Sequence, residues 1–152
     1  MTRWRLAAPL PEVWERVYRV ERWPGWWKGL RSVVELQAGD AQGVGGVWRF
    51  AWQGVLPFCM IVDVRTVRVE PFAVIEGVAS GAVEGRGRWR FSGDARRTTV
   101  RCDWRVRTTR AWMNVLAPLA RPLFAWNHDV VMRRGARGLS RALETLKPNS
   151  ES

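Results

Sequence analysis

The stretch TTVRCDWRVRT, residues 98–108, alternates apolar and polar side chains along its length. Val100, Cys102, Trp104 and Val106 occupy one set of alternate positions, and three arginines and an aspartate occupy the other. Because successive side chains of a β-strand point to opposite faces, the stretch predicts a strand with one buried and one exposed face. Such a strand is typical of an antiparallel sheet that covers a core on one side only.

The same two-residue period extends back along the chain to residue 31. Turn residues divide it into about six successive strands, and a further short strand is expected at residues 2–8. Within residues 58–70 (FCMIVDVRTVRVE) the apolar face changes near Arg65. One extra residue exchanges the two faces of a strand, so a β-bulge is predicted at that point.

Helical spacing replaces the alternation on either side of the sheet. Residues 11–20 carry valines at helical spacing, and residues 21–30 (ERWPGWWKGL) predict a short second helix or a tight turn. From residue 112 to residue 146 the helical spacing returns, with two prolines near its start that separate a short piece from the main helix. A long amphipathic helix is the element that remains to cover the apolar face of the sheet.

A chain of 152 residues, 47% of them hydrophobic, has the size and composition of one domain with a substantial core. We expect this domain to span residues 1–147, with a frayed polar tail at residues 148–152. The N-terminus lacks the apolar segment of a signal peptide, and no apolar run is long enough to cross a membrane. The cytoplasm is therefore the expected location.

The chain carries a formal net charge of +11, and only Lys28 and Lys147 of its 25 basic residues are lysines. Such a charge is typical of proteins that bind nucleic acid, an anionic membrane or an acidic ligand. The basic residues are spread along the chain without a tract of five or more, however, a distribution that favours a solvated basic surface over a nucleic-acid-binding function. One histidine and scattered carboxylates do not outline a metal site, and we expect no cofactor. The sequence does not determine the oligomeric state.

The order of elements resembles the START-like, helix-grip (SRPBCC) superfamily and, within it, the polyketide cyclase/dehydrase and lipid-transport group. The motifs that carry the resemblance are APLPEVWERV, VERWPGWWKGL, GDAQGVGGVWRF, GRWRF and WNHDVVMRRGARGL. The resemblance implies an α+β helix-grip fold, in which a curved seven-stranded antiparallel sheet grips a long C-terminal helix and two short helices follow the first strand. It also implies a hydrophobic cavity, although such folds include binders, carriers and enzymes. In this strand order Cys59 and Cys102 are not neighbours, so two free thiols are expected.

His128 is the only histidine of the chain. At about 100° per residue, it falls near the centre of the apolar arc of the last helix, and Arg133 and Arg137 fall on the opposite side. The arc consists of Phe124, Val131, Met132, Gly135, Leu139, Ala142, Leu143 and Leu146. Gly135 lies almost directly below His128 and permits a close approach to the sheet. His128 is thus expected to point toward the sheet, as a hydrogen-bonded core residue, a polar contact for a ligand, or a general acid or base.

Glu76 is the second candidate for acid/base chemistry. If residues 80–81 form a two-residue hairpin turn, Glu76 faces Gly85 and points inward, where a carboxylate near His128 would make a plausible acid/base pair. The alternative is a structural ion pair, because counting back through the preceding turn places Arg65 opposite Glu76.

Aromatic side chains at alternating strand positions are expected to line the cavity, although core packing explains some of them equally well. The expected ligand-binding residues are Trp48, Phe50, Trp52, Glu76, Trp89, Trp104, Phe124, His128, Val131 and Met132. A cavity of this kind binds apolar ligands by area and shape. The main expectation is a binder of a small polyketide-, lipid- or aromatic-like molecule. The alternative is a polyketide cyclase/dehydrase-type enzyme that uses His128, alone or with Glu76, for proton transfer.

Overall fold

The computed structural model describes residues 2–53, 59–108 and 111–144, with side chains for all of these except residues 108, 111–124 and 144. A short strand, β1 (Thr2–Leu6), opens the chain and is followed by helix α1 (Leu10–Tyr18) and a 3₁₀ helix, η1 (Val20–Gly25). Six strands and one long helix then complete the fold. They are β2 (Leu30–Gln37), β3 (Val47–Trp52), β4 (Met60–Glu70), β5 (Val74–Gly81), β6 (Val83–Gly93), β7 (Thr98–Thr108) and α2 (Ala111–Glu144).

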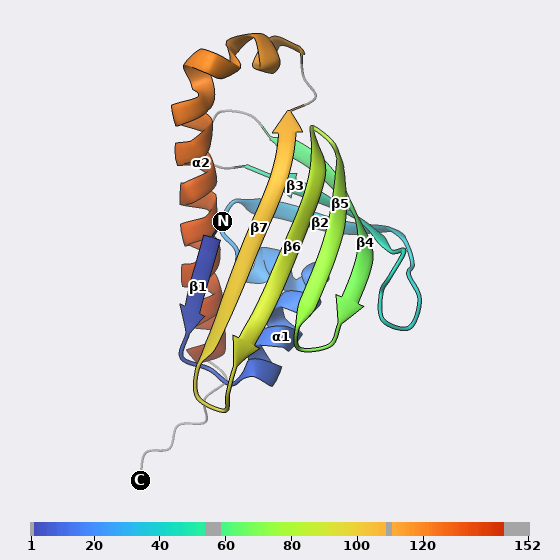
Figure 1. Cartoon of the computed structure of the whole chain (residues 1–152), viewed down its shortest axis with the longest axis vertical. Helices are drawn as coiled ribbons and strands as arrows, with labels where there is room; N and C mark the ends of the chain where they lie inside the picture. Colours follow the sequence, from blue (N-terminus) through green and yellow to red (C-terminus); the bar gives the residue numbers. More distant parts are fainter. Residues whose placement is uncertain (1, 54–58, 109–110, 145–152) are drawn as a thin grey trace.

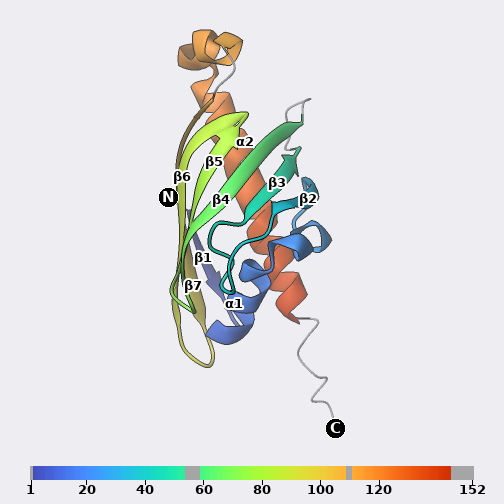
Figure 2. The ribbon, with the colours of Figure 1, turned by 90° about the vertical axis from the view of Figure 1, so that its right-hand side faces the viewer.

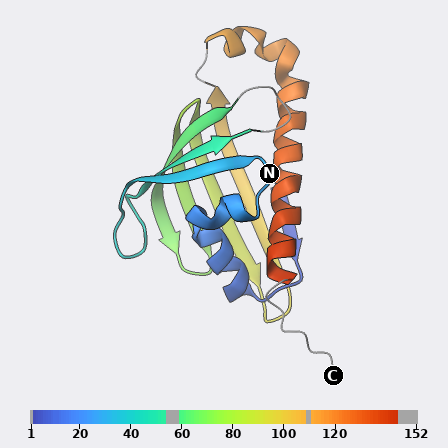
Figure 3. The same cartoon turned by 180° about the vertical axis from the view of Figure 1, so that it is seen from behind.

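The seven strands form one antiparallel sheet in the order β1-β7-β6-β5-β4-β3-β2. Figure 1 shows the sheet from its outer face, with the long part of α2 running beside it, and Figure 2 shows how the sheet curves toward the helix. Seen from behind, α1 and η1 lie on the same side of the sheet as α2 (Figure 3). The α+β helix-grip architecture is therefore confirmed, including the two short helices after the first strand.

Helix α2 follows the amphipathic pattern of its sequence. Met132, Leu139 and Leu143 are buried in the core, whereas Arg133 and Arg137 are exposed on the other side. The first turns of α2 run at an angle to the long remainder (Figure 1). The two prolines of this early part, at positions 118 and 122, lack the backbone N–H that a straight helix requires.

Trp27 lies at the centre of an aromatic core and is 2% exposed. Its ring centroid is 4.9–6.3 Å from those of five other tryptophans, namely Trp4, Trp23, Trp26, Trp52 and Trp89. The indole N–H donates a hydrogen bond of 2.9 Å to the backbone carbonyl of Val131 in α2. A Cβ at Gly135 would lie only 2.5 Å from Trp27 Cε2, so the indole occupies the space that this glycine leaves. Gly135 was expected to permit a close approach between the helix and the sheet. The group that approaches it is instead the ring of Trp27, in the segment after η1.

The strand register corrects two predictions. The β-bulge of β4 lies between Thr66 and Arg68, slightly beyond its expected place at Arg65. The turn between β5 and β6 is longer than a two-residue hairpin, because its closing pair is Ala79 and Gly85. Gly81 still pairs with β4, and the Ala82 N–H donates to a carbonyl of that strand. The added length changes which residues of β5 and β6 face each other.

Glu76 consequently pairs with Arg88 of β6, where Gly85 was expected, and with Arg68 of β4, where Arg65 was expected. Position 88 differs from position 85 by an odd number of residues, and such a shift moves a side chain to the opposite face of a sheet. The inward orientation predicted for the Glu76 carboxylate is therefore wrong.

Both cysteines are free thiols; Cys102 is buried in β7 and Cys59 is half-buried just before β4. No helix within the described residues is long and apolar enough to cross a membrane. The polar tail predicted at residues 148–152 and the side chain of Phe124 lie outside the part of the chain that is described.

Candidate functional site

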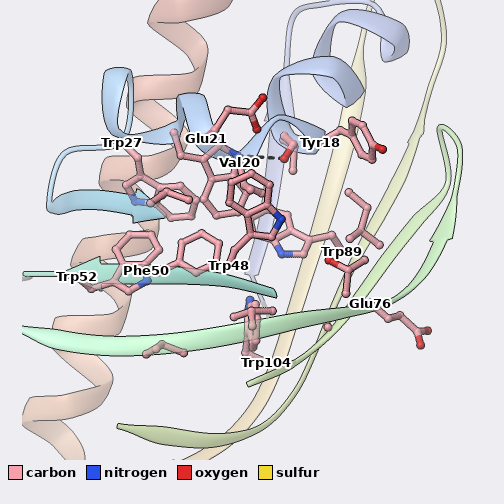
Figure 4. A pocket seen from close by; sticks show the side chains of 18 of the residues that line it. Tyr18, Val20, Glu21, Trp27, Trp48, Phe50, Trp52, Glu76, Trp89 and Trp104 are labelled. Carbon is pink, nitrogen blue, oxygen red and sulfur yellow. Dashed lines mark hydrogen bonds between the residues drawn. The ribbon is translucent and has the colours of Figure 1, made fainter. Parts of the chain in front are cut away.

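A pocket of about 1010 Å³ lies on the inner face of the sheet, bounded by the end of α1, by η1 and by α2. Its walls are mainly aromatic and branched aliphatic side chains, and Figure 4 shows the tryptophans that gather there. Nine of the ten residues predicted to bind ligand line it, and one of them, Glu76, does so only at its margin. The other eight are Trp48, Phe50, Trp52, Trp89, Trp104, His128, Val131 and Met132. The alternation of aromatic residues along β3, β6 and β7 brings them to this face.

Two glycines and a tryptophan in one row across the sheet shape the middle of the pocket. Gly77, Gly87 and Trp104 lie side by side on β5, β6 and β7. A Cβ at Gly87 would lie 2.4 Å from Trp104 Cδ2 and Cε3 and 2.6 Å from Cε2. Because these three atoms of the six-membered ring are almost equally distant from one point, the indole lies flat over Gly87. The other face of Trp104 is thereby turned toward the pocket.

His128 reaches the pocket from α2, next to Asn127 and one turn before Val131 and Met132. Its side chain is accessible to solvent, so it is not the buried core histidine that was one expectation. The surrounding protein nevertheless removes part of its hydration. This desolvation holds the pKa of His128 below its ordinary value, and the charge of Asp129 opposes part of the shift. The imidazole is therefore neutral at neutral pH and can donate or accept a hydrogen bond.

Glu76 touches the margin of the pocket, but its carboxylate is bound elsewhere. Oε1 lies 2.6 Å from Nε of Arg88 and 3.3 Å from Nη1 of Arg68. Figure 4 shows the Glu76 side chain pointing away from the tryptophans. The predicted cross-strand ion pair of Glu76 is thus present, but its partners are Arg68 and Arg88 instead of Arg65. Glu76 does not form an acid/base pair with His128.

Several pocket residues had no assigned site role in the sequence analysis. Trp23 and Trp27 from η1 and the segment after it line the pocket, together with Val64 and Ile75 of the middle strands. The cluster of tryptophans at residues 23–27 was the available signal, but its long-range contact with α2 is not visible in a local pattern.

One hydrogen bond ties the edge of the pocket together. The Tyr18 hydroxyl, at the end of α1, donates to the carbonyl of Gln42 at 2.7 Å, and both residues belong to the pocket lining. The loop between β2 and β3 is thereby attached to α1 beside the opening.

Within the described ranges, no three histidine, cysteine, aspartate or glutamate side chains come together as metal ligands would. The pocket therefore offers mainly apolar surface with a minority of polar groups, and among these the His128 imidazole is the one whose pKa desolvation lowers. Such an arrangement can remove an apolar molecule from water and fix its orientation through one polar contact.

The model of a family described as polyketide cyclase/dehydrase and lipid transport matches residues 6–132. Among solved structures, the chain is similar to the Zhui aromatase/cyclase from Streptomyces sp. R1128, with a TM-score of 0.76 and 18% identity over 99% of this chain and 96% of that one. It is also similar to a START superfamily protein from Mycobacterium smegmatis, with a TM-score of 0.69 and 13% identity over 96% and 97% of the two chains. At these identities the structural likeness concerns the fold alone. The curated proteins include no significant match to the sequence.

Proposed function

Because this chain belongs to the polyketide cyclase/dehydrase and lipid transport family, we propose that it binds a small hydrophobic molecule in the pocket between the sheet and α2. The ligand is polyketide-, lipid- or aromatic-like. The observation that carries the proposal is the aromatic lining of a pocket of about 1010 Å³. This volume is at the upper end of the range of about 300–1,000 Å³ that is common for small-molecule sites.

Desolvation supplies the binding energy. A ligand that buries about 200 Å² of apolar surface gains about 5 kcal/mol at about 25 cal/mol per Å², before the cost of association. Trp104, flat over Gly87, presents a ring face on which a planar ligand can stack. We therefore favour flat, fused-ring ligands over linear chains.

His128 is the polar anchor in this proposal. Its neutral imidazole lines the pocket, and among the described residues it has no hydrogen-bond partner. A hydroxyl or carbonyl oxygen of the ligand would satisfy it and would fix the ligand's orientation against the apolar walls.

Isothermal titration calorimetry with alizarin, a planar hydroxyanthraquinone, and with palmitate tests the proposal. We expect alizarin to bind, and Trp104→Leu to weaken its binding about tenfold through loss of ring stacking and contact area. The matched control is Trp126→Leu, because Trp126 is 49% exposed and does not line the pocket. Absence of binding by both ligands, or equal losses in the two variants, would contradict the proposal.

A second candidate function is catalysis of the cyclase/dehydrase type. The observation that favours it is the lowered pKa of His128, since a neutral imidazole in a pocket can remove a proton from the activated methylene of a poly-β-keto chain. Glu76 has no part in this candidate because Arg68 and Arg88 hold its carboxylate.

The test separates turnover from affinity. With a poly-β-keto thioester as substrate, His128→Gln is expected to lower the rate of product formation by about 10²–10⁴-fold while the affinity for alizarin changes little. Glu76→Gln serves as the control and leaves the rate unchanged. If wild-type protein forms no product, or if His128→Gln retains the wild-type rate, the chain is not an enzyme of this kind.

A further inference from the structure

The outer face of β1, β7 and β6 carries arginines that the pocket does not use. We call the following five residues the arginine face: Arg3, Arg5, Arg86, Arg90 and Arg101. All five are exposed, and they alternate along their strands with buried core residues. This is the side of the sheet turned toward the viewer in Figure 1, where no helix covers it. The arginine face is therefore a bare, strongly positive surface.

Like charges stand directly opposite one another on this surface. Arg3 pairs with Arg101 across β1 and β7, and Arg101 pairs with Arg90 across β7 and β6. Arg86 likewise pairs with Arg105. Since directly opposite like charges destabilise a sheet, the free protein carries a repulsion that a negatively charged partner would relieve.

The acidic groups on the same face are engaged with other arginines. Asp103 lies 3.8 Å from Arg105, and Glu84 lies 3.5 Å from Arg107. Glu76 is bound by Arg68 and Arg88. Within the part of the chain that is described, the arginine face has no ion pair of its own. Its five charges are available to an external anion.

The composition of the face indicates which anionic partner fits. None of the exposed large hydrophobic residues in the described part of the chain belongs to the outer face of β1, β7 and β6. The face consequently lacks the aromatic rings on which nucleic-acid bases stack and the apolar centre of a protein–protein interface. An anionic bilayer needs neither, because its headgroups attract basic residues by charge alone.

We propose that the arginine face adsorbs the protein onto an anionic phospholipid bilayer. The preference for a bilayer over other polyanions rests on the proposed function, because a hydrophobic ligand partitions into membranes and would be exchanged with the pocket there. The contact is peripheral and depends on ionic strength, as expected for exposed charges.

Flotation with vesicles of equal parts phosphatidylglycerol and phosphatidylcholine tests the proposal directly. The protein is expected to float with these vesicles at low salt and to dissociate from them as salt is raised. It is not expected to bind vesicles of phosphatidylcholine alone. Removing one face arginine should weaken binding about fivefold, so R3Q/R90Q/R101Q should weaken it about a hundredfold.

The matched control is R133Q/R137Q/R141Q, which removes the same charge from exposed positions on α2. The control should retain most of the binding if the face, and not net charge alone, contacts the bilayer. The proposal is overturned by equal losses in the two triple variants, by no flotation of the wild-type protein, or by face-dependent retention of duplex DNA without retention of vesicles.

Two further measurements keep the interpretation clear. R3Q/R90Q/R101Q should melt at low salt no lower than the wild-type protein, because the substitutions remove like-charge pairs. It should also bind alizarin from solution as the wild-type protein does. If alizarin binds and vesicles do not, the bilayer proposal alone is wrong. If vesicles bind and neither alizarin nor palmitate does, the proposed function is wrong.

Discussion

Gly135→Ala is expected to destabilise the protein, against the usual effect of this substitution in a helix. Alanine in a helix interior is ordinarily more stable than glycine by about 0.5–1 kcal/mol. Here the added Cβ would lie 2.5 Å from Cε2, 2.6 Å from Cζ2 and 2.9 Å from Nε1 of the buried Trp27 ring. The ring must move, and it is held on its other sides by aromatic neighbours.

Two costs follow from that movement. Overpacking of a buried site costs about 1–3 kcal/mol. Displacing the indole also breaks the hydrogen bond from Trp27 to the Val131 carbonyl, which leaves a buried donor unsatisfied at about 1–3 kcal/mol. After subtraction of the helix-propensity gain, the free energy of unfolding should fall by about 3 kcal/mol. For a chain of this size that corresponds to a fall in Tm of roughly 6–12 °C.

Urea unfolding of four proteins measures the effect: wild type, Gly135→Ala, Trp27→Leu and the double variant. If the clash with Trp27 is the cause, Gly135→Ala will cost far less in the Trp27→Leu background than in the wild-type background, because leucine leaves room for the new methyl group. A Gly135→Ala protein that is as stable as the wild type, or a cost that is the same in both backgrounds, would refute the reasoning.

Three further predictions rest on single groups. An NMR titration of the only histidine should show that the pKa of His128 lies below the ordinary value for histidine. As the pH falls, the unfolded chain then binds the proton at a higher pH than the folded chain does, so acidification should destabilise the fold. His128→Gln should remove that contribution. With a thiol reagent at native pH, the half-buried Cys59 should react first, whereas Cys102, whose burial raises its thiol pKa, should react only on unfolding; two fast thiols would contradict the structure. Thr98→Val should lower the free energy of unfolding by about 1–3 kcal/mol in thermal melts, because the buried Thr98 hydroxyl donates a 2.8 Å hydrogen bond to the Ala8 carbonyl; an unchanged Tm would contradict it.

The strands and helices of this fold were predictable because the burial of one face gives each of them a regular spacing of apolar residues. The alternation at residues 98–108 became β7, and the apolar arc of the last helix became the buried side of α2. The register between β5 and β6 was not predictable in the same way. Gly81 and Ala82 continue to bond to β4, a contact between segments far apart in the sequence, and this contact sets the length of the turn.

The site shows the same division between local and long-range information. The direction of His128 followed from the helical wheel, but its solvent-accessible position depends on a pocket that several strands enclose together. The role of Trp27 was also hidden, because its partner Gly135 lies on a different element. Residues whose environment is formed by distant segments are those that local patterns describe least well.

The tryptophan cluster has an optical consequence. The rings of Trp4 and Trp26 lie 5.3 Å and 5.4 Å from that of Trp27, and Trp4 lies 5.4 Å from Trp89. At such separations excitation energy migrates among indoles faster than they emit light. A ligand that directly quenches only the tryptophans lining the pocket would therefore also reduce the emission of the tryptophans buried behind them. The total tryptophan emission of this protein should thus fall when a ligand occupies the pocket, with the buried and the pocket-lining tryptophans quenched together.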